Sequence, residues 1–427
     1  MAIARPLRPS AAAVEDLADP VTRWRGGLAF LMPSMAVLPL LFVPQLGGAG
    51  VLLFLAATGL ALVPPGATPL HRLLRGWPVL TVAGFAILST LWSTAPPTTL
   101  RYGLQLAITV LVGMVIGGSE HPRRTLWGVF AAFGFYAVVS IAFGGSSAWG
   151  AGQDTAFTGL NGGKNYLADI VAIGFIAGLA CLLMALRRRR WLLATVTVAI
   201  LLVEVITLGL ARSSGAILGV VLAAGAMAGM LVLTRSAGGP RAMLIAALLI
   251  LSSVGIAAAA IEGPAIRAEL LQVMGKDDTL TGRVYLWYRA DTIMQQHPLL
   301  GTGYGAFWVQ GQLDAEGLWA YSGILNRLGF NFHNTQTEQR VGLGWIGYLL
   351  IAGITLGCTV LLIGRFFASP SMPGVFWSVL MIYELSRVGY EAIGPTPFNM
   401  GTVMMAAALA FATASGDRGA IAEERGG

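Results

Sequence analysis

The sequence WLLATVTVAILLVEVITLGLARSSGAILGVVLAAGAMAGMLVLTR, residues 191–235, decides the fold of this chain. It holds two apolar runs, each long enough to cross a hydrocarbon core as an α-helix, which takes about 20 residues. Only the short polar turn of residues 211–215 separates them, so the chain crosses, reverses and crosses back. Because the apolar residues are continuous rather than alternating, helices are favoured over a β-barrel.

Similar apolar runs recur along nearly the whole chain. Hydrophobic residues make up 56% of the 427 residues and charged residues only 11%, whereas a soluble domain carries about 25% charged residues. We therefore predict an all-α, polytopic transmembrane bundle. Its 12 expected spans are residues 26–46, 49–65, 78–93, 100–117, 125–144, 166–186, 191–210, 213–234, 241–260, 343–363, 372–393 and 398–414.

The spans divide the chain into five parts. Residues 1–25 are predicted to be a disordered cytoplasmic N-terminus, and residues 26–260 contain spans one to nine. A long periplasmic loop with amphipathic helices is expected over residues 261–342, followed by the last three spans in 343–414 and a cytoplasmic tail over 415–427.

The basic residues predict the orientation. Most of the 27 lie on the side of both termini, as the positive-inside rule requires of the cytoplasmic side. The net charge of +7 does not imply nucleic acid, because these arginines sit in short loops where anionic membrane lipids explain them. Cys181 and Cys358 fall inside predicted spans without metal-ligand spacing, so they are interpreted as buried apolar residues.

The long loop contains the stretch where chemistry is most expected. A helix is predicted over residues 281–296 with Thr281 as its N-cap. Its apolar stripe, expected to lie along the membrane surface, is formed at three- and four-residue spacing by Val284, Trp287, Ala290, Ile293 and Met294.

The glycines beyond that helix allow tight turns. Pro298 ends the helix, and Gly301, Gly303 and Gly305 then permit close approach of the backbone to a ligand. A phosphate-binding nest is one interpretation of these glycines, although their spacing alone is a weak signal. Tyr304 lies among them and is a candidate substrate-binding residue.

Two arginines are candidates for binding an anionic group. Arg212, in the turn between two spans, can clamp a phosphate or diphosphate together with Ser213. The alternative is an arginine that snorkels to lipid headgroups or pairs with Glu204 or Glu384. Arg283, at the start of the loop helix, would be the second cation, or else a solvated surface charge.

Two further positions carry candidate residues. Lys164 and Asn165 follow two glycines in a turn that either faces a ligand or simply enters a span. His333, followed by Asn334, lies shortly before the tenth span. Because histidine titrates near neutral pH, an imidazole here can accept a proton from an attacking hydroxyl, although a structural hydrogen-bonding role is the alternative.

The eleventh predicted span carries three ionisable residues on one helical face. Glu384, Arg387 and Glu391 follow i, i+3, i+7 spacing, so they are predicted to point together into the bundle. A salt-bridge ladder is one interpretation of this face, and an acceptor-binding wall is the other. Glu391 lies nearest the outer surface.

Five motifs occur in the order that resembles the bacterial O-antigen ligase and polysaccharide polymerase family. They cover roughly residues 155–410 and are Asn161-Gly-Gly-Lys164-Asn165, Ala211-Arg212-Ser-Ser-Gly215, Thr279-Leu-Thr-Gly-Arg283-Val-Tyr-Leu-Trp287, His297-Pro-Leu-Leu-Gly301-Thr-Gly-Tyr-Gly305 and His333-Asn334. The family often has a histidine before the Lys-Asn pair, where this chain has Gly163.

The resemblance implies a glycosyltransferase of the bacterial inner membrane that needs no metal or other cofactor. Its donor would be a glycan on undecaprenyl diphosphate, transferred at the periplasmic face with inversion, and its acceptor a glycan or lipid A core. The catalytic roles would fall on His333, Arg212 and Arg283, with Glu391 among the substrate-binding residues.

Two activities remain open within that family. The form of the Arg283 motif and the segment Glu391-Ala-Ile-Gly-Pro-Thr-Pro-Phe398 look more like the exopolysaccharide polymerase branch. A ligase would transfer a finished glycan with the same residues. A transporter is the minority alternative, because no internal repeat is visible and the long loop lies between spans nine and ten rather than between two halves.

Overall fold

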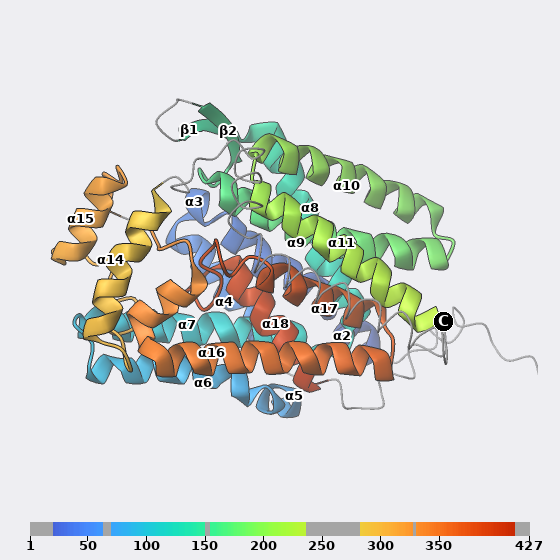
Figure 1. The fold of residues 1–427 in the computed structure, drawn as a ribbon. Helices are drawn as coiled ribbons and strands as arrows, with labels where there is room; N and C mark the ends of the chain where they lie inside the picture. Colours follow the sequence, from blue (N-terminus) through green and yellow to red (C-terminus); the bar gives the residue numbers. More distant parts are fainter. Residues whose placement is uncertain (1–19, 63–69, 150–153, 236–281, 328–329, 415–427) are drawn as a thin grey trace, which may run out of the picture.

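The computed structural model describes residues 20–62, 70–149, 154–235, 282–327 and 330–414. These residues form mainly long helices lying side by side (Figure 1). The first half contains α2 Pro20–Leu41, α3 Val43–Leu46, α4 Gly48–Leu62, α5 Leu70–Arg75, α6 Trp77–Leu88, the 3-10 turn η1 Ser89–Leu91, α7 Pro96–Gly117 and α8 Pro122–Phe143. The remainder contains β1 Gly145–Trp149, β2 Asp154–Gly159, α9 Lys164–Arg187, α10 Trp191–Ala211, α11 Ser214–Arg235, α14 Arg283–Gln296, α15 Leu313–Tyr321, α16 Thr335–Ala368, α17 Met372–Leu385 and α18 Met400–Ala414.

The chain is a multi-pass helical membrane protein. Among the described residues, six helices are long and apolar enough to cross a membrane, namely α7, α8, α9, α10, α11 and α16. Shorter apolar helices occur within α2, α4, α6, α17 and α18. Each predicted span coincides with one of these helices except residues 241–260, which lie outside the described residues, as do residues 1–19, the predicted C-terminal tail and the first part of the long loop. Residues 20–25, predicted to belong to a disordered terminus, form the start of α2.

Helix α17 ends earlier than the sequence predicts. It stops at Leu385 rather than at residue 393, and an irregular connection runs from there to α18. The Ser386 hydroxyl donates to the Tyr383 carbonyl oxygen at 2.7 Å, a local side-chain bond of the kind that competes with continued helix. The prediction of one helical face carrying Glu384, Arg387 and Glu391 is therefore wrong.

A β-hairpin between α8 and α9 is absent from the all-α prediction. Strands β1 and β2 pair antiparallel, with Ser147 opposite Ala156. Along β2, Ala156 and Thr158 are buried while Thr155 is exposed, so the strand presents one covered face. This two-residue alternation spans too few residues to be distinguished from loop in the sequence.

Helix α9 and the pair α7 and α18 hold the centre of the bundle together. Helix α9 contacts α8, α10, α11 and α17, and most of its length is buried inside the protein. Helix α7 lies against α18, where Gly113 and Gly117 meet the backbone of residues 403–407 with no room for a Cβ atom. Small residues at such crossings let helix backbones approach closely in a membrane bundle.

The two ends of the bundle differ in chemistry. The β-hairpin, the α10–α11 turn and the α14–α15 layer lie at one end (Figure 1). At the other end Arg123, Arg124, Arg188 and Arg190 line one pocket, and the Arg72 guanidinium donates to the Ser119 carbonyl oxygen at 3.0 Å. These arginines lie in short connections that the sequence assigns to the cytoplasmic side.

The α14–α15 layer has a small core of its own. Leu286, Ala290, Ile293 and Met294 of α14 pack with Phe307, Leu318, Trp319 and Phe332. The apolar stripe therefore faces protein rather than a membrane surface, and it includes Leu286 in place of Val284, whose side chain is exposed. Gly282, with a φ of 85°, is the N-cap of α14, so the prediction of Thr281 at that position is wrong.

The three loop glycines serve packing between segments. Gly301, Gly303 and Gly305 all have positive φ, and a Cβ atom on them would clash with Gly342, Ser93 and Tyr102, respectively. Their close approach is thus to other parts of the protein. It fixes the segment after α14 against η1, α7 and α16.

Candidate active site

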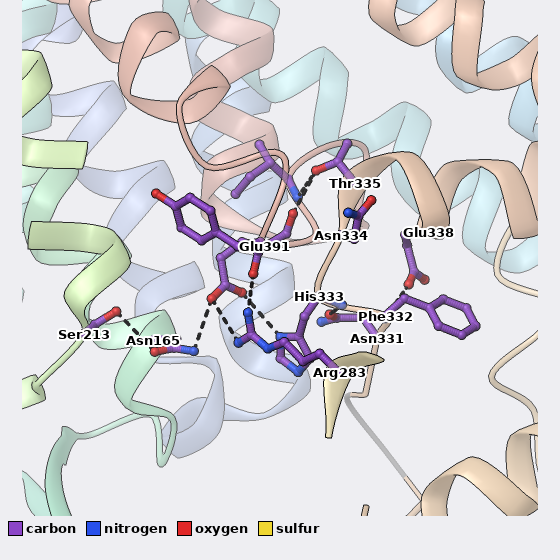
Figure 2. A network of polar contacts seen from close by, with 12 residues as sticks. Asn165, Ser213, Arg283, Asn331, Phe332, His333, Asn334, Thr335, Glu338 and Glu391 are labelled. Atoms are coloured by element: carbon purple, nitrogen blue, oxygen red, sulfur yellow. Dashed lines mark hydrogen bonds and ion pairs between the residues drawn. The ribbon is translucent and has the colours of Figure 1, made fainter. Parts of the chain in front are cut away.

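Glu391 lies at the centre of a polar cluster in the α17–α18 connection. Its Oε1 lies 3.3 Å from Asn165 Nδ2 and 3.5 Å from Arg283 Nη2, and its Oε2 lies 3.4 Å from His333 Nδ1. Figure 2 shows these side chains converging from α9, α14 and the segment before α16. The cluster thus brings together four residues that the sequence singles out.

The connection that carries Glu391 is held in place by its own backbone contacts. Thr335 Oγ1 donates to the Glu391 carbonyl oxygen at 2.9 Å and accepts from the Ile393 N–H at 2.8 Å. The Arg283 guanidinium also donates to the Tyr390 carbonyl oxygen. Glu391 therefore projects from a fixed turn rather than from a helix, which is why its position could not follow from helical spacing.

His333 adopts a left-handed backbone conformation, with a φ of 50°. Such a conformation is uncommon for residues other than glycine and is kept only where the surroundings enforce it. The Asn331 side chain accepts from the His333 N–H at 2.8 Å. The preceding Phe332 is held on both sides, since its N–H donates to Glu338 at 2.9 Å and its carbonyl accepts from Trp287 Nε1 at 2.8 Å.

The contact with Glu391 fixes the orientation of the His333 ring. A carboxylate beside Nδ1 favours the neutral tautomer that carries its proton there, which makes Nε2 the proton acceptor. His333 is about one quarter exposed, so the ring is accessible as well as oriented. A histidine held in this way is suited to general-base chemistry.

The electrostatics of the cluster favour an ionised Glu391. Burial by itself would raise the pKa of this carboxyl group, but the His333 hydrogen bond and the charges of Arg283 and Arg387 outweigh burial and hold the pKa below 4.5. The Arg283–Glu391 separation of 3.5 Å is longer than the roughly 2.7–2.9 Å of a tight charge-assisted bond. Arg283 therefore retains donor capacity for an anionic ligand.

Arg212 lies one residue from the cluster along the chain. It is the C-cap of α10 in a left-handed conformation, with a φ of 50°, and its side chain is exposed. The next residue, Ser213, donates to Asn165 Oδ1 at 3.2 Å and so joins the α10–α11 turn to Glu391 through Asn165.

The alternative ion pairs for Arg212 do not form. Glu204 is fully buried in α10, and neither of its carboxylate oxygens has a hydrogen-bond partner among the described residues. Glu384 lies 3.8 Å from Arg387 instead. Within the described part of the chain, the Arg212 guanidinium forms no hydrogen bond or ion pair, which leaves a cation at this end of the bundle available to a ligand.

Three other predicted residues lie at a helix start or anchor the backbone of another segment. Asn334 is the N-cap of α16, since its Oδ1 accepts from the Thr337 N–H at 3.0 Å while its Nδ2 donates to the Gly389 carbonyl oxygen at 3.1 Å. Tyr304 is buried apart from the cluster, and its hydroxyl donates to the Pro395 carbonyl oxygen at 2.7 Å. Lys164 is the first residue of α9, beside Asn165.

A second charged group lies deeper in the bundle. Arg387 forms an ion pair with Asp169 of α9, and the Tyr383 hydroxyl donates to Asp169 at 3.0 Å. Arg387 and Glu384 are both almost fully buried. Of the predicted ladder, the Glu384–Arg387 contact is present at 3.8 Å. Arg387 also pairs with Asp169 on α9, which sequence spacing did not indicate.

The described residues also bear on metal binding. Among them, no group of three or more His, Cys, Asp or Glu side chains is arranged to hold a metal ion. The cluster instead offers cationic and hydrogen-bonding groups, which bind anionic oxygen atoms. Its chemical capacity is therefore anion binding by Arg283 together with proton transfer at His333.

Two comparisons with known proteins give the family. A family described as O-antigen ligase matches residues 199–352, a range that includes Arg212, Arg283 and His333. The chain is also 30% identical over 331 residues to the exopolysaccharide production protein ExoQ of Rhizobium meliloti (strain 1021), with 75% of this chain and 73% of that protein covered. On both grounds, together with its multi-pass helical fold, the chain belongs to the O-antigen ligase family.

Proposed function

We propose that this protein polymerises repeat units of an exopolysaccharide that are carried on undecaprenyl diphosphate. The reaction takes place at the periplasmic face of the bacterial inner membrane, without a metal and with inversion at the anomeric carbon. The observation that carries the proposal is the contact of Glu391 with both His333 and Arg283. It places a proton acceptor and a cation on either side of one carboxylate.

In the proposed step, His333 accepts a proton and the arginines stabilise the leaving diphosphate. His333 Nε2 takes the proton from an acceptor hydroxyl, and the hydroxyl oxygen forms a bond to the anomeric carbon. The bond from that carbon to the diphosphate breaks on the opposite face, and the electron pair leaves with the phosphate oxygen. Arg283 and Arg212 stabilise the charge that develops there, as fixed cations do in other transfer reactions.

The surrounding residues position these groups. Glu391 orients the His333 ring and stabilises the positive charge that the ring gains when it takes the proton. Asn165 with Ser213 connects Glu391 to the turn that carries Arg212. Lys164, next to Asn165, supplies a further cation for the diphosphate. Asn334 and Tyr304 support the site through the segments that they anchor.

The proposed orientation follows from the two ends of the bundle. Twelve spans with both termini in the cytoplasm put the arginine-rich end inside, as the positive-inside rule favours. The cluster and the α14–α15 layer then face the periplasm. This arrangement lets a lipid-linked donor enter from the membrane and an acceptor glycan arrive from water.

The name of the relative supports the polymerase over the ligase. ExoQ is described as a protein of exopolysaccharide production, which agrees with assembly of a secreted polymer. A ligase that transfers a finished glycan to lipid A core is the second candidate, favoured by the description of the matching family. Both would use the same residues.

The first experiment is to delete the gene and analyse the lipid-linked glycans that accumulate. Single repeat units on undecaprenyl diphosphate would support the polymerase, whereas long chains on the same lipid would identify the ligase. Complementation with Arg212→Ala, Arg283→Ala or His333→Ala should leave the product absent although the protein inserts. Normal product from all three variants would refute the mechanism.

A further inference from the structure

A cavity of about 430 Å³ lies behind the Phe332–His333 segment, within the range of roughly 300–1,000 Å³ that small-molecule sites occupy. Neither Arg283, His333, Glu391 nor Asn165 lines it. Its walls come from α7, the loop after α14, α15, the start of α16 and the α17–α18 connection. Its lining includes the side chains of Gln105, Trp308, Trp319, Phe330, Glu338 and Gln339.

One wall of this chamber is a continuous aromatic surface. The Trp308 ring lies 5.8 Å from that of Trp319 and 5.1 Å from that of Phe330, between ring centroids. Phe330 in turn lies 5.9 Å from the His333 ring. The aromatic wall therefore extends from the chamber to the proposed base.

Polar groups stand among these rings. Glu338 uses one oxygen to accept from the Phe332 N–H, and a carboxylate has further acceptor positions. Gln339 and Gln105 add amide donors and acceptors to the lining. Trp319 is almost fully buried, yet its indole N–H has no acceptor among the described residues, which costs free energy unless a ligand supplies one.

This combination selects one class of ligand. A diphosphate would meet the Glu338 carboxylate, and the Arg327 guanidinium in the lining is already paired with Glu316 at 3.0 Å. An isoprenoid chain would leave the carboxylate and amides without hydrogen bonds. A sugar ring fits both features, because its C–H face packs on an aromatic ring while its hydroxyl groups bond to carboxylate and amide atoms.

We propose that the chamber binds a sugar residue of the acceptor glycan, an inference that rests on the proposed glycosyl transfer. Glu338 and Glu391 lie on opposite sides of the Phe332–His333 segment in Figure 2. An inverting displacement needs the acceptor on the side of the anomeric carbon away from the diphosphate. With the diphosphate at Arg283, the chamber is on the acceptor side of His333.

The test measures saccharide binding separately from transfer. Full-length protein in detergent is titrated with an oligosaccharide fraction released by mild acid from the host's own secreted polysaccharide, and binding is followed by saturation-transfer NMR. We expect Phe330→Ala and Gln105→Ala to weaken binding by about tenfold, the effect of losing about 1.4 kcal/mol of contact energy.

Two matched variants control for folding. Tyr288→Ala removes an aromatic ring from the exposed face of α14, outside the chamber, and should bind like the wild type. Trp319→Phe keeps an aromatic ring but removes the pyrrole part of the indole together with its N–H, so it should weaken binding without changing the elution of the protein on gel filtration. Equal binding by the wild type, Phe330→Ala, Gln105→Ala and Trp319→Phe would overturn the chamber proposal.

A transfer assay tests the chamber proposal separately from the proposed glycosyltransferase function. With lipid-linked donor, the chamber variants should raise KM for the acceptor and leave KM for the donor unchanged. Transfer with unchanged acceptor KM would refute the chamber while sparing the glycosyltransferase. Chamber-dependent saccharide binding without any transfer would support the chamber as a sugar site and refute the proposed reaction.

Discussion

Two groups of charged side chains are built from similar residues but lie in different surroundings. In the group of Asp169, Glu384 and Arg387, the side chains are 12%, 0% and 6% exposed, whereas Arg283, Glu391 and His333 are 14%, 20% and 25% exposed. The first joins α9 to the end of α17 and the connection after it, and the second joins the start of α14, the segment before α16 and the α17–α18 connection. Access to water, rather than residue type or spacing, separates a structural ion pair from a candidate reactive one.

The largest expected effect comes from breaking the buried group. Arg387→Ala leaves the Asp169 and Glu384 carboxylates in the bundle without their cation, which typically costs about 3–5 kcal/mol. We expect little monodisperse protein after extraction, measured by fluorescence-detected gel filtration. Arg289→Ala is the matched control, because it breaks a more exposed pair with Asp314 and should cost about 0–1 kcal/mol. Similar yields from the two variants would contradict a structural role for Arg387.

The second prediction breaks the cluster without breaking the fold. His333→Ala should reduce glycan transfer by about 10²–10⁴-fold, the usual contribution of a general base, while thermal unfolding stays close to that of the wild type. His297→Ala is the control, since His297 is exposed at the end of α14. Loss of activity with His297→Ala alone would place the base elsewhere.

The third prediction uses pH to compare Glu391 with its amide. The folded-state pKa of Glu391 lies below 4.5, so its ionised form adds stability that is present above that value and is lost as the pH falls through the folded-state pKa. Glu391→Gln should therefore have a lower Tm than the wild type near pH 7, and the difference should shrink on acidification below 4.5. A Tm difference that grows at acidic pH would show that Glu391 is stabilised as the neutral acid.

The smallest expected effect comes from the hydrogen bond that connects the cluster to the turn carrying Arg212. Ser213→Ala removes one hydrogen bond to Asn165, worth about 0.5–1.5 kcal/mol. We expect transfer to fall by a few-fold through a less fixed Asn165 and α10–α11 turn, as measured by kcat/KM. Ser214→Ala, at the first position of α11, should have no comparable effect. Equal losses from both variants would attribute the effect to the turn as a whole.

Much of the bundle could be predicted from the sequence because each long apolar run by itself indicates a membrane-spanning helix. The pair α10 and α11, with Arg212 between them, follows directly from two runs and a polar turn. The end of α17 could not be predicted in this way, because the chain remains fairly apolar past Leu385 while the Ser386 hydroxyl and the fixed turn around Glu391 end the helix. The β-hairpin was missed because its strands are short.

The residues of the site could be predicted from the sequence, but their arrangement in space could not. Polar residues in an apolar chain identify Arg283, His333 and Glu391 as candidates, since ionisable groups near a membrane are costly. Their meeting depends on contacts between residues far apart in sequence, such as Thr335 with the Glu391 carbonyl. The chamber depends on such contacts too, because its aromatic wall combines α15 with two loops, and its polar residues Glu338 and Gln339 come from the start of α16.

The close packing of α7 on α18 has a consequence for biosynthesis. Gly113 and Gly117 are translated well before residues 403–407, whose backbone covers them. Until α18 leaves the ribosome, the small-residue face of α7 lacks its partner. This contact can therefore form only after α18 has been synthesised.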